Sequence, residues 1–328
     1  MYLYVDASYL ANAAANGLPP EALRFGPPAI ALDIIAKVAQ YVRTYNATRV
    51  YFCLDPKGGS WRKQIYAGYK GQREAKLAKD PARKLAHDMA STTVQDVLPE
   101  LVTLMGCPNF VYPWVEADDM AAAAIALNQG KPGLIITADN DYWQLITQQI
   151  YMVDPIHSLR YQLNEQGHIV RYKGDGTIES LMMTPQETLL AKALEGDDSD
   201  NLMGLINVGK KTAADAVIEK TVQKLLTEQT GMITPRKHKV HNPNPVPVQQ
   251  DARAVVSFNL SMMDLYNAKI HPKVKEIVAD MERKALRPVV TNFTQTAIWL
   301  EQKHQFAREQ AEATARQLCS TFRTLWTS

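Results

Sequence analysis

Three acidic residues stand close together near the middle of the chain, at Glu116, Asp118 and Asp119. The alanine-rich run 121–127 follows them and is a strong helix former, so we expect the three carboxylates at or in the first turn of a helix. Acidic residues there can simply cap the helix and complement its dipole. Asp118 and Asp119 are adjacent, however, and point about 100° apart around a helix, so they could instead serve two neighbouring cations. This cluster alone leaves both interpretations open.

Further carboxylates follow apolar runs that are predicted to be buried strands. The runs and the acids after them are residues 2–5 with Asp6, residues 50–54 with Asp55, and residues 134–137 with Asp139 and Asp141. Helices are predicted at 29–46 and 94–105, and short strands at 109–112 and 150–154. Strands that alternate with helices predict an α/β domain with a mostly parallel sheet, in which ligands bind beyond the carboxyl ends of the strands.

Carboxylates gathered at one edge of a sheet predict bound cations. Like charges would raise one another's pKa values and destabilise the fold unless cations neutralised them. Neither His nor Cys belongs to the set, and ligands that are all oxygen favour Mg²⁺ or Mn²⁺ over zinc. Any single aspartate of this kind more often caps a loop, but that explanation fits the whole set poorly.

Basic and aromatic residues are interleaved between residues 57 and 93. Trp61, Tyr66 and Tyr69 stand among lysines and arginines, which is typical of a surface that contacts a phosphate backbone and stacks bases. A solvated helix face remains an equal alternative. The part from 72 to 93 is long for a connection, and Pro81 divides it into two short helical pieces. Each is too short to be stable alone, so we expect an arch that is mobile without DNA.

The stretch 184–224 is predicted to be mostly helical, with two further acids and a tight turn in its centre. The acids are Asp197 and Asp200, and the turn enters a helix at Gly209, Lys210, Lys211 and Thr212. Backbone N–H groups and two ammonium groups at that turn suit a phosphate, although an ordinary helical hairpin is equally compatible. Residues 234–248 are basic and then proline-rich, which predicts an extended surface loop and leaves a DNA contact open.

Length and composition limit which classes of protein this chain can belong to. The 328 residues carry a formal net charge of +2, and 46% are hydrophobic, which is enough for a sizeable core. Apolar runs are too short for a membrane span, and the first residues do not resemble a signal peptide. The cysteines, Cys53, Cys107 and Cys319, are odd in number and widely spaced, which favours a reducing cytoplasm.

Together these motifs resemble the 5′-nuclease family, which comprises flap endonucleases, phage 5′→3′ exonucleases and the 5′-nuclease domains of bacterial DNA polymerases. The resemblance runs from Asp6 to about Val217 and rests on motifs in a fixed order. These are the strands ending in Asp6 and Asp55, Trp61-Arg62, Tyr69-Lys70-Gly71-Gln72-Arg73, Glu116-Ala117-Asp118-Asp119, Asp139-Asn140-Asp141, Gly196-Asp197-Asp198-Ser199-Asp200-Asn201, and the turn at Gly209.

The resemblance implies a PIN-like α/β catalytic core over residues 1–183, with a helical arch at about 70–93. It implies a mostly helical region over 184–328, whose helix–three-turn–helix element grips duplex DNA and can hold K⁺. It also implies two Mg²⁺ or Mn²⁺ ions per active site. The first would be surrounded by Asp6, Asp55, Glu116 and Asp118, and the second by Asp119, Asp139, Asp141, Asp197 and Asp200.

The catalytic residues that the resemblance implies are Lys70, Arg73, Asp6 and Asp118. The implied DNA-binding residues are Arg62, Lys63, Tyr69, Lys70, Arg73, Gly209, Lys210, Lys211 and Thr212. The expected substrate is DNA with a 5′ flap, a nick or a free 5′ end, with RNA–DNA hybrids as a further candidate. We expect a monomer, away from membranes, that acts in replication, primer removal or repair in a bacterial or phage-infected cytoplasm.

The sequence departs from the family at two places. Many members carry glycine straight after the first aspartate and an arginine some residues later, whereas here Ala7 follows Asp6, and Asn12 and Asn16 occupy that neighbourhood. The family's usual Gly-Ile-Gly turn is Asn207-Val208-Gly209 here. Asparagine tolerates left-handed backbone conformations, so we expect the turn to survive. A non-catalytic DNA-binding relative and a nuclease directed mainly at RNA in hybrids remain alternatives. Pure binding would not require so much negative charge beside DNA, which argues against the first.

Overall fold

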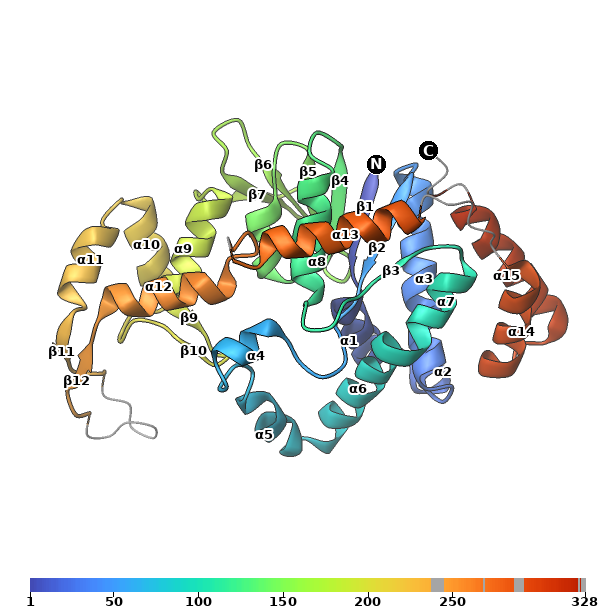
Figure 1. Ribbon diagram of the computed structural model, residues 1–328, viewed down its shortest axis with the longest axis horizontal. Coiled ribbons are helices and arrows are strands. Elements are labelled where there is room, and N and C mark those ends of the chain that lie inside the picture. The colour runs from blue at the N-terminus through green and yellow to red at the C-terminus, as the bar shows by residue number, and fades with distance from the viewer. Residues whose placement is uncertain (237–244, 268, 286–291, 324, 326–328) are drawn as a thin grey trace.

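The structure is a computed structural model, and it describes residues 1–236, 245–267, 269–285, 292–323 and 325. Its centre is an eight-stranded sheet with the order β3-β2-β1-β4-β5-β6-β7-β8 (Figure 1). The strands are β1 (Tyr2–Asp6), β2 (Arg49–Cys53), β3 (Asn109–Phe110), β4 (Gly133–Ile136), β5 (Ile150–Asp154), β6 (Leu159–Leu163), β7 (Ile169–Tyr172) and β8 (Ile178–Ser180). The expected α/β class with a mostly parallel sheet is therefore confirmed.

The strands from β3 to β5 are all parallel, so their carboxyl ends meet at one edge of the sheet. β1 lies between β2 and β4, and its residues Leu3, Tyr4 and Val5 are fully buried. Strands buried on both faces read as continuous apolar runs, which is why the sequence predicted them. β6, β7 and β8 extend the sheet in antiparallel fashion and were not expected. Their side chains are mostly only partly buried, so they lack such a run.

Helices cover the sheet and continue beyond it. They are α1 (Ala7–Gly17), α2 (Pro20–Leu23), α3 (Pro27–Thr44), α4 (Trp61–Ile65), α5 (Gln72–Ala78), α6 (Pro81–Thr92), the π-helix η1 (Thr93–Val97), α7 (Leu98–Leu104), α8 (Ala117–Leu127), the 3-10 helix η2 (Asn140–Leu145), α9 (Pro185–Glu195), α10 (Lys210–Ile218), α11 (Val222–Glu228), α12 (Ala252–Met263), α13 (His271–Ala285), α14 (Phe293–His304) and α15 (Arg308–Phe322). α8 packs against β1, β2 and α13, while α3 packs against α1, α7 and α15.

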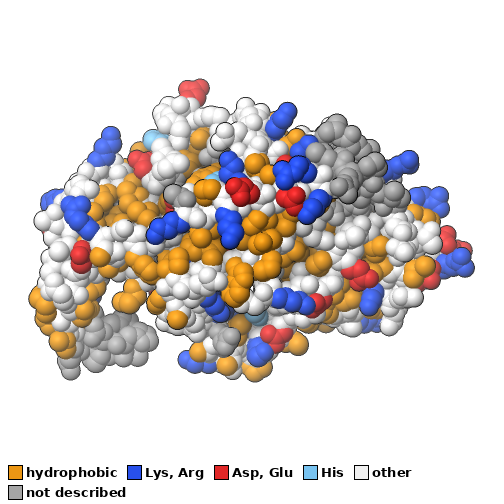
Figure 2. All heavy atoms as spheres, in the orientation of Figure 1, with side chains coloured by type: hydrophobic (Ala, Val, Ile, Leu, Met, Phe, Trp, Pro, Cys, Tyr) orange, Lys and Arg blue, Asp and Glu red, His pale blue; other side chains and the backbone are white. Residues whose placement is uncertain are grey.

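α13 crosses the front of the molecule in Figure 1. Figure 2 shows Lys and Arg side chains interleaved with Asp and Glu over this helix, which is typical of a solvent-facing surface. Among the described residues, every helix is too short or too polar to cross a membrane. The three cysteines are free and buried.

Two hydrophobic cores hold the chain together. The first combines the sheet and its helices with apolar side chains of α13, α14 and α15, and the second joins α9 to α12 and includes Tyr69. The C-terminal helices therefore pack against the α/β core, although the expected boundary at residue 183 would assign them to the other region. That boundary remains a proposal, and the packing shows that the chain returns to the first core after α12.

The expected arch consists of α5 and α6, and Pro81 begins the second of these helices, as predicted. The side chain of Asp80 caps α6 by accepting the backbone N–H of Arg83 at 3.0 Å. α6 packs against α1, whereas α5 lies at the lower edge of Figure 1. The expected loop over 234–248 connects two short strands, β11 (Gly231–Ile233) and β12 (Val248–Gln250), which pair as a hairpin. Residues 237–244 of this loop lie outside the described residues. A second small pair joins β9 (Gly196–Asp197) to β10 (Leu202–Met203).

Candidate active site

Five carboxylates line one pocket of about 370 Å³ at the carboxyl edge of the parallel strands, and four of them are expected around one metal. These four are Asp6 at the end of β1, Asp55 after β2, and Glu116 and Asp118 at the start of α8, and we call them the first acidic group. Asp139 follows β4 and lines the same pocket. The parallel strands thus bring together the acids that the sequence predicted for one site.

Asp6 is buried in surroundings that disfavour its charge. Its carboxylate accepts hydrogen bonds from the backbone N–H of Tyr9 and the hydroxyl of Thr137, both at 2.9 Å. Burial, opposed by the Tyr9 N–H and reinforced by the charges of Asp55 and Asp139, raises the pKa of Asp6 to about 7. A divalent cation among these carboxylates would offset both the burial and the repulsion.

Asp55 is oriented by groups from two other elements. Its carboxylate accepts the hydroxyl of Ser8 at 2.6 Å and the backbone N–H of Ala117 at 3.0 Å. Ser8 belongs to α1, and Ala117 is the first residue of α8, so Asp55 joins the starts of two helices. Sequence reasoning missed Ser8 and Thr137, because serine and threonine beside a strand end carry no distinctive pattern.

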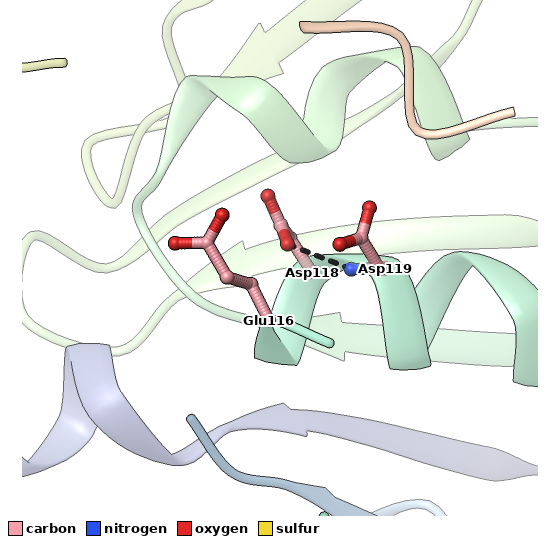
Figure 3. A group of neighbouring side chains, drawn as sticks. All are labelled: Glu116, Asp118 and Asp119. Carbon is pink, nitrogen blue, oxygen red and sulfur yellow. Dashed lines mark hydrogen bonds between the residues drawn. The ribbon is translucent and has the colours of Figure 1, made fainter. Parts of the chain in front are cut away.

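The acids that begin α8 differ in their surroundings, and Figure 3 shows all three rising from its first turn. Glu116 lies 2.5 Å from both Lys70 Nζ and Arg62 Nη1. Burial would raise the pKa of Glu116, but Lys70 and Arg62 lower it to about 2. Burial raises the pKa of Asp118 well above its ordinary value, and Arg62, at 3.6 Å, offsets that rise only in part.

Asp119 was expected in the second metal region, but it lies beside Glu116 and Asp118 instead. Its Oδ1 accepts from Arg62 Nη2 at 3.0 Å, and its Oδ2 accepts from Trp61 Nε1 at 2.7 Å and Arg62 Nη1 at 3.1 Å. With both oxygens engaged, Asp119 acts as the counter-ion of a buried arginine.

Arg62 was expected to contact DNA, and the structure contradicts this. The residue is only 2% exposed, and its Nε donates to the carbonyl oxygen of Met262 at 2.7 Å. Its guanidinium faces Glu116, Asp118 and Asp119 instead. The alternation of basic and aromatic residues did not reveal which side chains turn inward. Lys63, the next residue, is exposed, so its expected role remains a proposal.

Asp141, Asp197 and Asp200 form a second acidic group, with carboxylate oxygens within 4.8 Å of one another. Lys192 on α9 donates to Asp141 and lies 2.7 Å from Asp197. Burial would lower the pKa of Lys192, but these two aspartates raise it. Its ammonium therefore neutralises charge that the sequence assigned to a metal. Lys192 was missed because a single lysine within a predicted helix carries no signal.

Asp139 connects the two groups. It caps η2, where its Oδ1 accepts the backbone N–H of Asp141 at 2.9 Å. It lines both the first pocket and a larger one of about 690 Å³, which also contains Asp141, Lys192 and Asp197. The two pockets that hold the predicted metal ligands therefore meet at Asp139.

Tyr69 was also expected to bind DNA, but it is only 2% exposed. Its hydroxyl lies 3.2 Å from Glu116 and 3.0 Å from Asp200, so it joins the two acidic groups. Lys70, the next residue, has a φ of 56° and donates its backbone N–H to the carbonyl oxygen of Asp200 at 3.0 Å. Left-handed backbone at a non-glycine residue costs energy and is concentrated at functional sites. The side chains of Tyr69 and Lys70 both contact Glu116, and the Tyr69 hydroxyl also contacts Asp200.

Two cationic side chains at the base of the arch line the first pocket. Lys70 and Arg73 both line it, and the Arg73 side chain is 46% exposed, with Nη2 3.9 Å from Asp200. Both cations therefore face the acids and remain accessible from the pocket. This placement agrees with their expected roles at a scissile phosphate, which remain a proposal.

The turn before α10 has the backbone predicted for it. Asn207 has a φ of 65°, which confirms the expected left-handed conformation. Gly204 lies so close to Glu195 that an added Cβ would stand 1.8 Å from its carbonyl oxygen, so only glycine fits there. Gly209 is the N-cap of α10, and it is exposed together with Lys210, Lys211 and Thr212.

This α/β fold, with carboxylates at the carboxyl edge of its parallel strands, is that of a family of nucleases. The model of the 5′-3′ exonuclease N-terminal resolvase-like domain matches residues 2–173. The chain therefore belongs to this family.

Two curated relatives and two solved structures place the chain more closely. It is 30% identical to the thermostable DNA polymerase I of Thermus aquaticus over 213 residues, which are 64% of this chain and 23% of that protein. It is 30% identical to DNA polymerase I of Mycobacterium leprae over 224 residues, or 67% of this chain and 23% of that protein. The chain thus spans about a quarter of the length of these polymerases.

The fold is shared with proteins of bacteriophage T5. The T5 D15 protein co-crystallised with metal ions matches with a TM-score of 0.55 and 21% identity, covering 85% of this chain and 98% of that one. The D15 flap endonuclease in a pseudo-enzyme–product complex with DNA and metal ions matches with a TM-score of 0.51 and 17% identity, over 98% of both chains.

Proposed function

We propose that the protein is a metal-dependent, structure-specific 5′ nuclease that hydrolyses DNA phosphodiesters as a 5′→3′ exonuclease and 5′-flap endonuclease. The observation that carries this proposal is the first acidic group, which lies in a pocket lined also by Lys70 and Arg73. Membership of the 5′-3′ exonuclease family and the metal- and DNA-bound T5 proteins of the same fold support it.

The residues present fit divalent cations. The donors are carboxylate oxygens, which hard cations prefer, and burial together with mutual repulsion raises the pKa values of Asp6 and Asp118. The Lys192 ammonium between Asp141 and Asp197 marks the second group as a place that favours positive charge. Mg²⁺ or Mn²⁺ would be held by Asp6, Asp55, Glu116 and Asp118, and by Asp139, Asp141, Asp197 and Asp200. Bound there, such ions activate water and stabilise the attacking and leaving oxygens.

The chain's own cations complete the site. Lys70 and Arg73 would place positive charge on the scissile phosphate, where negative charge increases in the transition state. Lys70 is held by Glu116 at 2.5 Å, so a phosphate must compete with, or share, that ammonium group. Arg62 and Tyr69 position Glu116 from its buried side. These contacts fix the acidic edge before substrate arrives.

The proposed substrate is DNA with a 5′ flap, a nick or a free 5′ end. Exposed Lys210 and Lys211 at the start of α10 would bind the duplex through its phosphates, and α5 and α6 would cover the 5′ single strand. A K⁺ ion at the Gly209 turn, cleavage of RNA–DNA hybrids, a monomeric state and a cytoplasmic location also belong to the proposal. The similarity to DNA polymerases I supports a role in replication, primer removal or repair.

Cleavage of three labelled substrates tests the proposal. A 5′-flap, a nicked duplex and a single strand are incubated with Mg²⁺ and, in parallel, with Ca²⁺. We expect cleavage with a 5′-phosphate product in Mg²⁺, preference for the substrates that contain duplex, and little or no cleavage in Ca²⁺. Binding without cleavage in both Mg²⁺ and Mn²⁺ would show a non-catalytic DNA-binding relative instead.

A further inference from the structure

The turn before α10 is tied to the β11–β12 hairpin by the side chain of Asn207. Its Nδ2 donates to the carbonyl oxygen of Thr234 at 2.9 Å, and its Oδ1 accepts the backbone N–H of Arg236 at 2.7 Å. One amide therefore holds the chain just beyond β11 at two points. A glycine could adopt the same left-handed backbone but could make neither bond.

A second amide fixes the hairpin from its other strand. Gln250 on β12 is 6% exposed, and its Oε1 accepts the backbone N–H of Ile206 at 2.9 Å. Its Nε2 donates to the carbonyl oxygen of Gln229 at 2.7 Å. The turn, the end of α11 and both strands of the hairpin thus form one connected unit. Buried amides with both ends satisfied favour a single arrangement of this kind.

Arg236 follows this unit in the chain. Its backbone N–H is held by Asn207, and its side chain is exposed. Within the part of the chain that the structure describes, its guanidinium has neither a hydrogen bond nor an ion pair. Lys210 and Lys211 are exposed at the start of α10, which Asn207 precedes by three residues. The unit therefore presents cations from two segments of the chain. Planar guanidinium groups match phosphate oxygens in a bidentate manner, which makes arginine suited to a nucleic-acid backbone.

We propose that Arg236 is a phosphate contact for duplex DNA and that Asn207 is the residue that positions it beside the Gly209 turn. The inference rests on the proposed function, because it takes DNA as the partner. It extends the duplex-binding surface from α10 to the base of a hairpin whose loop was predicted to be an extended surface loop, with a DNA contact left open. An exposed guanidinium that has no acidic partner among the described residues, on a backbone that Asn207 holds, suits a phosphate contact.

Three variants test the proposal by binding of a plain duplex at several salt concentrations. Arg236→Ala should weaken binding about 5- to 10-fold and reduce the salt slope by about 0.9, as expected for one lost phosphate contact. Asn207→Gly keeps the left-handed backbone but removes both bonds, and should weaken binding about 3-fold. The double variant should bind no worse than Arg236→Ala, because Asn207 acts through Arg236.

Arg308→Ala is the matched control, since it also removes one exposed positive charge. Arg308 begins α15, at the opposite end of the molecule from the hairpin in Figure 1. If Arg236→Ala and Arg308→Ala have the same salt slope as the wild-type protein, Arg236 is not a phosphate contact. Additive losses in the double variant would overturn the role of Asn207. A wild-type protein that cuts a flap while these variants are unaffected would refute only this inference, whereas a wild-type protein that fails to bind duplex would refute the proposed function as well.

Discussion

The two acidic groups neutralise similar charge in different ways. In the first, Asp6 is buried and Asp118 is partly buried, both with raised pKa values, and the nearby cations, Lys70 and Arg62, contact Glu116 most closely. In the second, Lys192 lies directly between Asp141 and Asp197, and it helps to lower the pKa of Asp197. Both groups retain a deficit of positive charge, because burial also raises the pKa values of Asp141 and Asp200. The second group differs in that a cation already lies directly between two of its carboxylates.

This difference predicts unequal affinities for divalent ions. A cation entering the first group relieves the repulsion that Lys70 and Arg62 leave between these carboxylates, and it need not displace a cation that lies between them, so it should bind tightly. A cation entering the second group must displace the Lys192 ammonium or share its partners, so it should bind more weakly. Protein charge and metal charge therefore compete at the same oxygens, and the sequence of the acids alone does not show which prevails.

The largest expected effect comes from removing one carboxylate from the first pocket. Asp118→Asn and Asp139→Asn should each lower the rate of flap cleavage by at least about 100-fold, because metal charge no longer stabilises the transition state. Duplex binding should persist within a few-fold, since the basic surface is intact. Substantial Mg²⁺-dependent cleavage by both variants would contradict the assignment of these acids.

Lys70→Ala should act on the chemical step rather than on binding. Its ammonium lines the first pocket, so its loss should slow single-turnover cleavage about 100-fold while duplex affinity changes little. Lys63→Ala is the control, because it removes an exposed lysine from the same segment. Equal rate losses in the two variants would show that general charge, and not position, explains the effect.

Asp119→Asn separates structure from metal binding within one helical turn. It leaves the buried Arg62 without its bidentate partner and should lower the free energy of unfolding by about 3 kcal/mol. Asp198→Asn, at an exposed position, should change it by less than about 0.5 kcal/mol. Urea denaturation of the metal-free proteins measures both. A stable Asp119→Asn protein that has lost a metal ion would restore the role first expected for Asp119.

The metal-free protein should lose stability as pH rises from about 4 to 7. The folded-state pKa of Asp6 is raised from 3.8 to about 7, so in this window the folded state keeps a proton that the unfolded state has released. The melting temperature should therefore fall with rising pH, and Mg²⁺ should restore it at pH 8. Asp6→Asn should flatten this part of the profile. An identical pH slope in the variant would show that Asp6 is not the group responsible.

The smallest effect concerns the arch. We expect amide hydrogen exchange in residues 72–93 to be fast in the free protein and slower when a 5′-flap substrate is bound. α6 packs against α1, α3 and η1, whereas α5 packs against α6. The protection of α5 against exchange should therefore change most. Strong protection in the free protein with no further gain from DNA would contradict a mobile arch.

Much of the fold could be predicted because apolar runs and the acids that end them carry strong local signals. β1, β2, β4 and β5 were expected close to their observed bounds, and the left-handed turn at Asn207 followed from backbone chemistry. The antiparallel strands β6 to β8 lacked such signals. The return of α13 to the first core depends on contacts between distant segments, which no local pattern records.

The site was predictable as a set of acids but not as a network of partners. Which cations turn inward is decided by tertiary packing, and this is why Arg62 and Tyr69 were expected at the surface and lie buried. Lys192 pairs with two aspartates of the second group, yet its position becomes informative only when α9 is placed beside η2. Residue types thus indicated the chemistry, and packing determined how the charge is shared.

Titration of the DNA-free protein with Mn²⁺ by calorimetry tests the unequal-affinity account most directly. We predict a tighter site that Asp118→Asn removes and a weaker site that Asp197→Asn removes. Lys192→Met should strengthen the weaker site, because the competing ammonium is gone while the aliphatic part of the side chain is kept. Two sites of equal affinity, or a second site that is unchanged in Lys192→Met, would contradict the claim that protein and metal compete for the second acidic group.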